Sequence, residues 1–165
     1  MQQLQAINIG IFGGGQLGRM LLQKAIVLDL HISVLDPDED APCRHICKEF
    51  FHGSFTDYDA VYNFGKQFNL ITIEIENVNI EALERLEKEG IKVHPSSAVI
   101  KTVQDKGLQK EFYKKHNFPT ADFVLVENRN EISEHASLLP LMHKSRKGGY
   151  DGKGVFVLKK SADIE

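Results

Sequence analysis

The 165-residue chain has no tryptophan, and its only cysteines are Cys43 and Cys47. Two cysteines cannot form a disulfide framework, which excludes the small secreted domains that depend on several disulfides and favours a reducing compartment. No apolar run reaches the ~20 residues that a membrane-spanning helix needs. The first residues lead straight into a strand pattern, so no signal peptide is expected. We therefore expect a cytoplasmic globular protein without a membrane partner.

A large charge excess is also missing, because 20 Lys and Arg against 23 Asp and Glu give a net charge of −3. Residues 1–100 carry 8 basic and 14 acidic side chains, whereas residues 101–165 carry 12 and 9. A moderately basic second part suits a polyphosphate ligand better than a nucleic acid, which usually requires a denser basic stripe. A solvated surface that differs between the two parts explains the counts equally well. We expect no nucleic-acid partner.

Short apolar runs alternate with amphipathic segments through the first hundred residues. The runs indicate strands and the segments indicate helices. Strands are expected at 7–12, 31–36, 47–51, 70–77 and 91–93, and helices at 17–28, 57–68 and 80–89. This alternation requires a mainly parallel sheet. We predict an α/β fold in which residues 1–100 form a Rossmann-like domain.

The pattern changes near Ser96, and we assign residues 101–165 to a second domain. Two short helices separated around Val103 are expected within 97–116, a further helix at 130–139, and strands at 122–127, 141–144 and 155–158. Ser161 followed by acidic residues is typical of a helix N-terminus. A domain that stops one turn into a helix would be unusual, so we expect the chain to be part of a longer protein.

A glycine-rich turn follows the first expected strand. Gly13, Gly15 and Gly18 match the spacing of the dinucleotide-binding fingerprint. Glycines let the backbone adopt positive φ angles and approach a ligand closely, and free amide groups at a helix start attract anions. On its own, the turn indicates a nucleotide or another phosphorylated ligand.

A second glycine-rich segment, residues 146–154, lies between two strands that are expected to be antiparallel. It contains four glycines, three basic residues and one tyrosine, and Lys144 precedes it at the end of the incoming strand. Such a loop can fold over phosphates. It is not a P-loop, because Lys147 and Gly154 occupy positions that a P-loop gives to glycine and to serine or threonine. A flexible hairpin without a ligand is the alternative.

Five motifs, in order and across nearly the whole chain, resemble the ATP-grasp enzymes of purine synthesis, and most closely those that carboxylate aminoimidazole ribonucleotide. The motifs are GGGQLGRM at 13–20, TIEIEN at 72–77, QDK with QK at 104–106 and 109–110, PTA at 119–121, and GGYDGKG at 148–154. The first and last together are quite specific to this family. A related formate-dependent transformylase usually differs in the first motif.

The resemblance implies a Rossmann-like pre-ATP-grasp domain over residues 1–100 and an incomplete ATP-grasp α+β subdomain over residues 101–165. It implies a ligase in which ATP phosphorylates bicarbonate and the resulting carboxyphosphate carboxylates the exocyclic amine of aminoimidazole ribonucleotide, giving ADP and phosphate. It also implies a homodimer for the whole enzyme and Mg²⁺ held by carboxylates beyond this chain, so that no metal ligand is expected here. We expect the chain alone to bind ATP feebly and to turn over no substrate.

The same resemblance implies three groups of site residues. The catalytic residues would be Tyr150 and Lys153. The ribonucleotide substrate would be bound by Gly15, Gln16, Leu17 and Glu76. ATP would be bound by Lys106, Lys144, Gly149, Tyr150, Asp151, Gly152, Lys153, Gly154 and Val155. Three of these, Lys106, Lys144 and Lys153, stand where the family commonly has arginine.

The arrangement of these residues can also be anticipated. Glu74 and Glu76 alternate with isoleucines, so both are expected on one face at the end of a strand, with Glu76 nearer to the ligand. Two solvated acids at the edge are the alternative. The two glycine-rich turns are expected to converge on one cleft, one at the sugar phosphate and one over the triphosphate.

Two other functions remain open from the sequence. An NAD(P)-binding Rossmann domain of an oxidoreductase would explain residues 1–36, with Asp36 as the ribose ligand, but would leave residues 148–154 unexplained. A non-catalytic nucleotide-binding module is the other. A comparison of ATP binding with NADH binding separates the ATP-grasp hypothesis from the NAD(P)-binding hypothesis, because only the ATP-grasp hypothesis predicts that Lys144→Ala weakens nucleotide binding.

Overall fold

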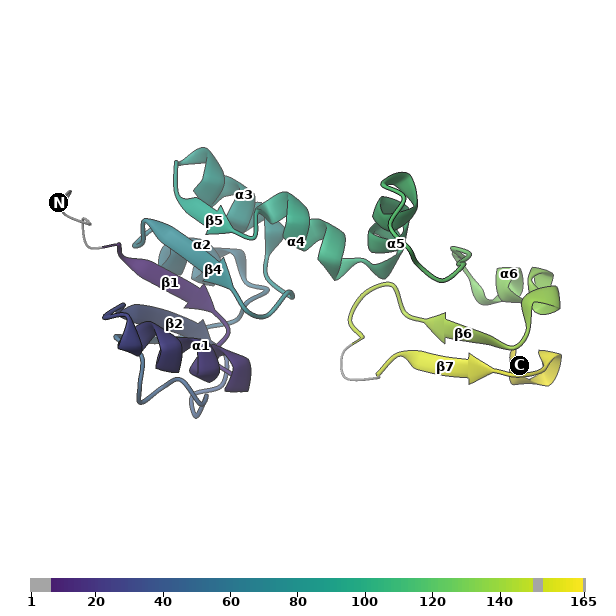
Figure 1. Cartoon of the computed structure of the whole chain (residues 1–165), viewed down its shortest axis with the longest axis horizontal. Coiled ribbons are helices and arrows are strands. Elements are labelled where there is room, and N and C mark those ends of the chain that lie inside the picture. Colours follow the sequence, from purple (N-terminus) through teal and green to yellow (C-terminus); the bar gives the residue numbers. More distant parts are fainter. Residues whose placement is uncertain (1–6, 150–152, 165) are drawn as a thin grey trace. The chain divides into compact units, whose positions relative to one another are not determined.

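The computed structural model describes residues 7–149 and 153–164. The chain divides into two compact units, residues 1–101 and 102–165 (Figure 1). Each unit has its own sheet: five strands in the first and two in the second. Among the described residues, no helix is long and apolar enough to cross a membrane.

Unit 1 is built on a five-stranded parallel sheet with the order β3-β2-β1-β4-β5. The strands are β1 (Ile9–Phe12), β2 (Ile32–Asp36), β3 (Phe50–His52), β4 (Leu70–Ile73) and β5 (Lys92–His94). The central strand β1 and its neighbour β4 are in register from Ile9 opposite Leu70 to Phe12 opposite Ile73. This topology confirms the predicted Rossmann-like α/β fold.

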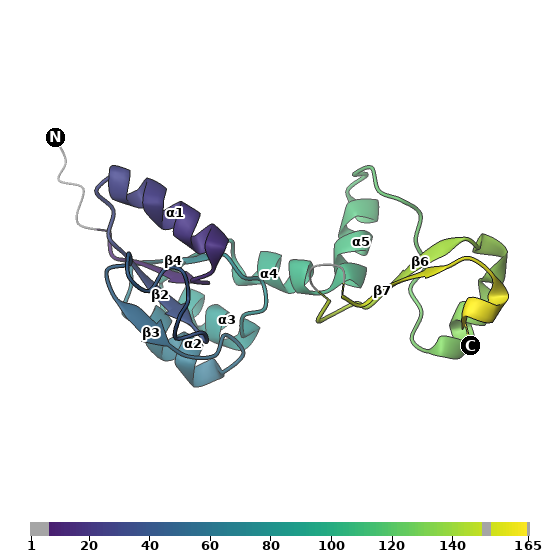
Figure 2. The same ribbon diagram turned by 90° about the horizontal axis from the view of Figure 1, so that it is seen from below.

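Three helices cover the two faces of this sheet. The helices are α1 (Gln16–Val27), α2 (Tyr58–Gly65) and α3 (Ile80–Lys88). Figure 2 shows α1 on one face and α2 with α3 on the other. Every residue of β1 and β2 is buried, as expected for parallel strands with helices on both faces. Asp57 and Asn79 cap α2 and α3 by accepting hydrogen bonds from helix amides at 2.6 and 2.9 Å.

The core of unit 1 consists of two apolar clusters separated by the sheet. The cluster under α2 and α3 contains Phe12, Phe64 and Leu86, and the rings of Phe12 and Phe64 lie 5.2 Å apart. The cluster under α1 contains Leu22 and Val34. Because both faces of β1 are packed, the turn that follows Phe12 is held on a rigid base.

Unit 2 begins within α4 (Ser97–Gln104) and is built around one antiparallel hairpin. Its other elements are α5 (Lys106–Lys115), α6 (Arg129–Glu134), the 3₁₀ helix η1 (Ala136–Leu138), β6 (Leu141–Lys144), β7 (Val155–Leu158) and the 3₁₀ helix η2 (Ser161–Ile164). The expected division into two helices is confirmed, although the break falls at Asp105, which caps α5. The antiparallel pairing of β6 with β7 is also confirmed.

Several element boundaries predicted from the sequence are wrong. The third strand begins at Phe50 and not at Cys47, because the amide of Cys47 donates to the carbonyl of Cys43 in a helical turn at 3.0 Å. Residues 122–127 form no strand, and no described segment pairs with them. Helix α6 ends at Glu134 and continues only as η1. An apolar run predicts a strand only where a partner strand accepts its backbone hydrogen bonds.

Candidate functional site

The glycine-rich turn of unit 1 connects the carboxyl end of β1 to the start of α1. Gly13 has a φ of +114°, a backbone conformation that side chains disfavour. A Cβ atom at Gly13 would also collide with the carboxylate of Glu74, the residue that follows β4. The chain order reverses between β1 and β4, and such switch points are where parallel α/β sheets bind ligands. The turn therefore lies at the favoured ligand edge of this sheet.

Asp36, at the end of β2, holds this turn in place. Its Oδ2 accepts a hydrogen bond from the amide of Gly14 at 2.6 Å, and its Oδ1 accepts one from the amide of Asp38 at 2.8 Å. The residue is only 7% exposed. Both carboxylate oxygens are thus engaged within the protein, which argues against Asp36 as the ribose ligand of an NAD(P)-binding domain.

The start of α1 presents backbone amide groups without a side-chain cap. Gly15 occupies the N-cap position, no side chain caps the helix, and its first turn contains no acidic residue. A Cβ atom at Gly15 would meet no atom within 4 Å, and Gln16 and Leu17 are exposed. Uncapped amides and the helix dipole attract an anion. Three of the four residues expected to bind the substrate therefore lie together beside open space.

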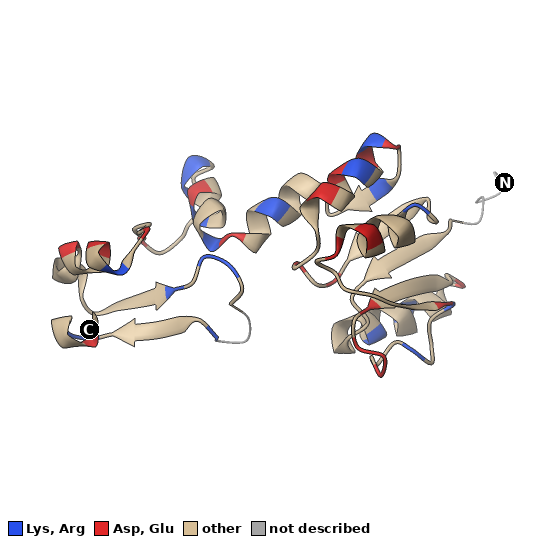
Figure 3. Ribbon diagram, turned by 180° about the vertical axis from the view of Figure 1, so that it is seen from behind, with Lys and Arg blue, Asp and Glu red and all other residues tan. Residues whose placement is uncertain are grey.

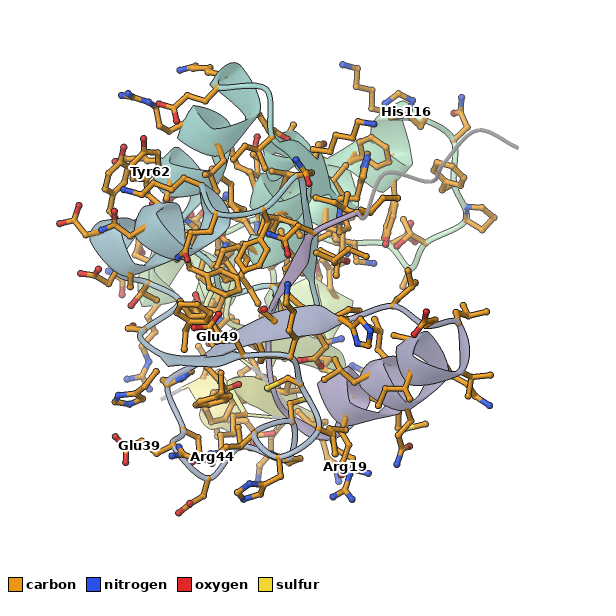
Figure 4. All side chains as sticks on the ribbon, turned by 90° about the vertical axis from the view of Figure 1, so that its left-hand side faces the viewer. Arg19, Glu39, Arg44, Glu49, Tyr62 and His116 are labelled. Carbon is orange, nitrogen blue, oxygen red and sulfur yellow. The ribbon has the colours of Figure 1, made fainter. Side chains whose placement is uncertain are left out.

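Two arginines lie near this part of unit 1. Arg19 extends from α1 and Arg44 from the segment after β2, and both are exposed. Figure 4 shows the two side chains on the same side of the unit, and the guanidinium of Arg44 donates to the carbonyl of Glu39 and lies over the ring of Phe50. Arg19 belongs to the first motif, at 13–20, whereas no sequence motif included Arg44. Two exposed guanidinium groups of this kind add positive charge around the turn.

The acidic residues after β4 are arranged differently from the prediction. The strand ends at Ile73, because the amides of Glu74 and Ile75 both turn to the carbonyl of Phe12, at 2.8 and 3.4 Å. The expected strand alternation therefore does not extend to Glu76. Glu74 is half-buried, and its burial, reinforced by the charges of Asp36 and Glu76, raises its pKa. Glu76 is exposed, and its contact with substrate stays a prediction.

The glycine-rich loop of unit 2 connects β6 to β7. At the ends of the two strands Lys144 pairs with Val155, and the amide of Ser145 donates to the carbonyl of Gly154 at 2.8 Å. The side chains of Lys144 and Lys153 are exposed, and Figure 3 shows basic positions at the end of β6 and just before β7. The predicted residues Tyr150, Asp151 and Gly152 lie outside the described residues.

Lys106 comes from a different element but reaches the same loop. It is the first residue of α5, and its Nζ donates a hydrogen bond to the carbonyl of Gly149 at 3.1 Å. Its backbone amide donates to the carbonyl of Arg146 at 2.9 Å. The structure thus brings Lys106 and Gly149 together, as a shared nucleotide site requires.

An ion pair that sequence reasoning missed lies beneath this contact. Arg146 donates to both carboxylate oxygens of Asp105, at 3.0 Å each. Burial opposes the charge on Asp105, but the hydrogen bonds from Arg146 and from the amides of Leu108 and Gly107 outweigh it and lower its pKa. An aspartate before a helix is a recognisable N-cap signal. Its pairing with a residue 41 positions away has no signal in a single sequence.

Among the described residues, no group of three or more His, Cys, Asp or Glu side chains is arranged to hold a metal ion. Near the glycine turn lie two carboxylates, those of Asp36 and Glu74, and both oxygens of Asp36 accept hydrogen bonds from backbone amides. Neither unit by itself thus offers a metal site in the part of the chain that the structure describes.

Comparison with known protein families gives a match for each unit. The model of the ribonucleotide synthetase preATP-grasp domain matches residues 6–104. The model of the ATP-grasp domain matches residues 111–165. The two matches follow one another along the chain and together leave only a few residues outside.

Individual proteins similar to the chain are enzymes of one kind. A chloroplastic phosphoribosylaminoimidazole carboxylase of Vigna aconitifolia is 34% identical over 161 residues, covering 98% of the chain and 29% of the plant protein. An N5-carboxyaminoimidazole ribonucleotide synthase of Staphylococcus aureus is 35% identical over 160 residues, covering 96% of the chain and 42% of the bacterial protein.

The chain also resembles solved structures. An N5-carboxyaminoimidazole synthase of Aspergillus clavatus, solved with ADP and 5-aminoimidazole ribonucleotide, superimposes with a TM-score of 0.83 at 34% identity. The match covers 96% of the chain and 42% of the fungal protein. The chain therefore spans less than half the length of the proteins that it resembles.

Proposed function

The chain belongs to the ribonucleotide synthetase preATP-grasp family, and on that premise we propose that it serves an ATP-dependent carboxylation of 5-aminoimidazole ribonucleotide. In the proposed reaction a bicarbonate oxygen attacks the γ-phosphorus of ATP, which releases ADP and forms carboxyphosphate. The exocyclic amine of the ribonucleotide then attacks the carboxyl carbon, losing a proton and releasing phosphate. The product is the N5-carboxyamino ribonucleotide.

In this proposal, unit 1 binds the ribonucleotide. The uncapped amides at the start of α1 and the open space beside Gly15 suit its phosphate group, and Gln16 and Leu17 border the same space. A carboxylate accepts hydrogen bonds from ribose hydroxyls or from the substrate amine. Glu76 has that role in the hypothesis drawn from the sequence, and the half-buried Glu74 is the second candidate because it lies against Gly13.

Unit 2 binds ATP in this proposal. Lys106, Lys144 and Lys153 neutralise phosphate oxygens as point charges, without the paired hydrogen bonds that an arginine supplies. Lys153, together with Tyr150, would also contact carboxyphosphate. The loop from Gly149 to Val155 excludes water from this labile intermediate, which otherwise hydrolyses.

Three further features belong to the same proposal. Mg²⁺ neutralises the phosphates of ATP, and its carboxylate ligands lie in the part of the relatives that this chain does not match. The enzyme acts in the cytoplasm as a homodimer on its small-molecule substrates, ATP, bicarbonate and the ribonucleotide. In this proposal the chain alone binds ATP weakly and completes no reaction, because its described residues hold no group of three or more acidic, histidine or cysteine side chains that could bind Mg²⁺.

The observation that supports the proposal most strongly is that relatives of one kind of enzyme match both units of the chain. An NAD(P)-binding domain would account for unit 1 alone, whereas the Aspergillus clavatus structure with ADP and the ribonucleotide matches 96% of the chain. A regulatory module without catalysis would require no basic loop beside Lys106. The carboxylase therefore explains more of the chain than either alternative.

A graft tests the proposed reaction. The chain is joined to the part of the Staphylococcus aureus synthase that follows its matched 160 residues, and ADP release is measured with ATP and Mg²⁺. We expect ADP release that requires both bicarbonate and aminoimidazole ribonucleotide, and its loss in Lys153→Ala. A folded graft that binds ATP but releases no ADP with both substrates contradicts the proposal.

A further inference from the structure

The base of the unit 2 loop, defined here as residues 145–149 and 153–154, is attached to the start of α5 at several points. Two contacts involve Lys106, whose backbone amide donates to Arg146 and whose Nζ donates to the carbonyl of Gly149. Two more are the hydrogen bonds from Arg146 to Asp105. The four contacts join segments about 40 positions apart into one local structure.

Asp105 is the centre of this attachment. It is 5% exposed and caps α5, because its Oδ1 also accepts from the amides of Gly107 and Leu108 at 2.8 and 3.2 Å. The same carboxylate thus fixes the first turn of α5 and receives the planar guanidinium of Arg146. Paired hydrogen bonds of this kind fix orientation as well as distance.

The first turn of α5 lies close to the guanidinium of Arg146. A Cβ atom added at Gly107 would lie 2.7 Å from Nε of Arg146, a separation that real Cβ atoms do not show. The first turn of α5 thus lies directly against the guanidinium. A side chain at Gly107 would require the side chain of Arg146 to shift.

Arg146 and Lys106 differ in the charge of the groups that they contact. The guanidinium of Arg146 faces the carboxylate of Asp105, with a further ion pair to Glu127 at 3.6 Å. The Nζ of Lys106 donates to a carbonyl oxygen, which carries no formal charge. Among the residues that the structure describes, no carboxylate forms an ion pair with Lys106, whereas the charge of Arg146 is compensated by Asp105 and Glu127.

We propose that Asp105 and Arg146 are positioning residues, whose ion pair holds Lys106 beside Gly149 at the base of the loop. The claim that Lys106 binds a nucleotide rests on the proposed function, but the claim that the ion pair positions Lys106 does not. Arg146 would affect nucleotide affinity through Lys106 and the loop base, and would not contact phosphate itself.

Amide hydrogen exchange without any ligand tests the positioning. The amides of Lys106 and Ser145 report the attachment, because they donate to Arg146 and Gly154. We expect Arg146→Gln to accelerate their exchange about tenfold, since it removes the charged hydrogen bonds to Asp105. For Arg146→Lys, which keeps the charge but loses the planar guanidinium, we expect exchange rates between those of the wild type and Arg146→Gln. The matched control Lys147→Gln removes one exposed positive charge next to Arg146 and leaves the exchange unchanged.

Asp105→Asn is the second variant, because its amide oxygen keeps the helix cap while the negative charge is lost. It is expected to accelerate the same two amides, and the amides of unit 1 in the same sample report whether the rest of the chain stays folded. Exchange in Arg146→Gln and Asp105→Asn equal to that in Lys147→Gln overturns the proposal.

A titration with ATP separates this proposal from the proposed function. If the wild-type chain binds ATP, we expect Arg146→Gln to weaken binding about tenfold and Lys147→Gln less than about threefold. Accelerated exchange in Arg146→Gln without ATP binding by the wild-type chain would contradict the nucleotide site and support the positioning role. Unchanged exchange together with ATP binding would support the site and overturn the positioning role.

Discussion

The carboxylate of Asp36 accepts a hydrogen bond from the amide of Gly14 at 2.6 Å, and so joins the end of β2 to the turn after β1. The bond spans 22 residues and is buried. It holds the glycine turn in place, while a Cβ atom at Gly15 would meet no atom within 4 Å. The turn is therefore rigid before any ligand arrives, which lowers the entropy lost on binding.

Removal of this carboxylate should loosen the turn. Asp36→Ala leaves the buried amide of Gly14 without its partner, so we expect the free energy of unfolding to fall by about 2 kcal/mol. Urea unfolding measures this loss. The matched control is Asp38→Ala, because the side chain of Asp38 is exposed and accepts from the amide of Asp40 within the same loop. Equal stability of the two variants would show that the Asp36 contact does not hold the turn.

The pKa of Glu74 gives a pH dependence of known sign. Burial first, and then the charges of Asp36 and Glu76, raise this pKa above its ordinary value of 4.5. The folded chain therefore binds the Glu74 proton more tightly than the unfolded chain. The stability that this proton contributes is complete below 4.5 and is lost as the pH rises through the raised pKa.

The Glu74→Gln variant isolates this effect. It has no carboxyl group to titrate, so its stability relative to the wild type should increase as the pH rises from about 4 to about 7. Chemical unfolding at several pH values gives the difference, and Glu49→Gln, at an exposed position labelled in Figure 4, is the control. A difference between Glu74→Gln and the wild type that does not change with pH would contradict the assignment.

The two cysteines should react at different rates. Cys43 is fully buried, and burial first, with the nearby Cys47 and Asp36, raises its pKa to about 11. The pKa of Cys47 is also raised by burial, but this residue is partly exposed. Since the thiolate is the reactive form, we expect iodoacetamide to label Cys47 at least ~10 times faster than Cys43. Mass spectrometry of wild type and Cys47→Ser checks this, and equal rates would contradict it.

The side chain of Lys144 should contribute to binding of ATP and not to binding of a dinucleotide. Its side chain is exposed at the end of β6, beside the loop, and we expect Lys144→Ala to weaken ATP binding about tenfold. Lys159→Ala removes an exposed charge just beyond β7 and is the control. Binding of NADH in place of ATP, or ATP binding that is insensitive to Lys144→Ala, would favour the oxidoreductase alternative.

The sequence predicts the order of elements in unit 1 well because β1 and β2 are buried along their whole length. The runs around Ile9 and Val34 are mostly apolar, as expected for buried parallel strands, and glycines mark the turn between β1 and α1. Helix capping by Asp57 and Asn79 depends on residues three positions away, so local sequence contains the information. The glycine turn, with Gly15 and Gln16, could therefore be located from the sequence.

The contacts that shape the two turns were not predictable in the same way. The bond from Gly14 to Asp36 and the pair of Asp105 with Arg146 join distant positions, and many acidic residues could equally have been the partner. The strand predicted at 122–127 fails for a related reason, since a strand requires a partner outside its own sequence. Glu74 and Glu76 were expected on one strand face, but the chain bends after Ile73.

The central claim is that the start of α1 binds the ribonucleotide, and a titration of the ¹⁵N-labelled chain with 5-aminoimidazole ribonucleotide tests it most directly. We predict saturable shifts of the amide signals of Gly15, Gln16 and Leu17. Gly15→Val should fold normally, since its Cβ meets open space, but should abolish these shifts by filling the ligand side of the turn. Unchanged signals at these three residues, or equal shifts in Gly15→Val, would contradict the claim.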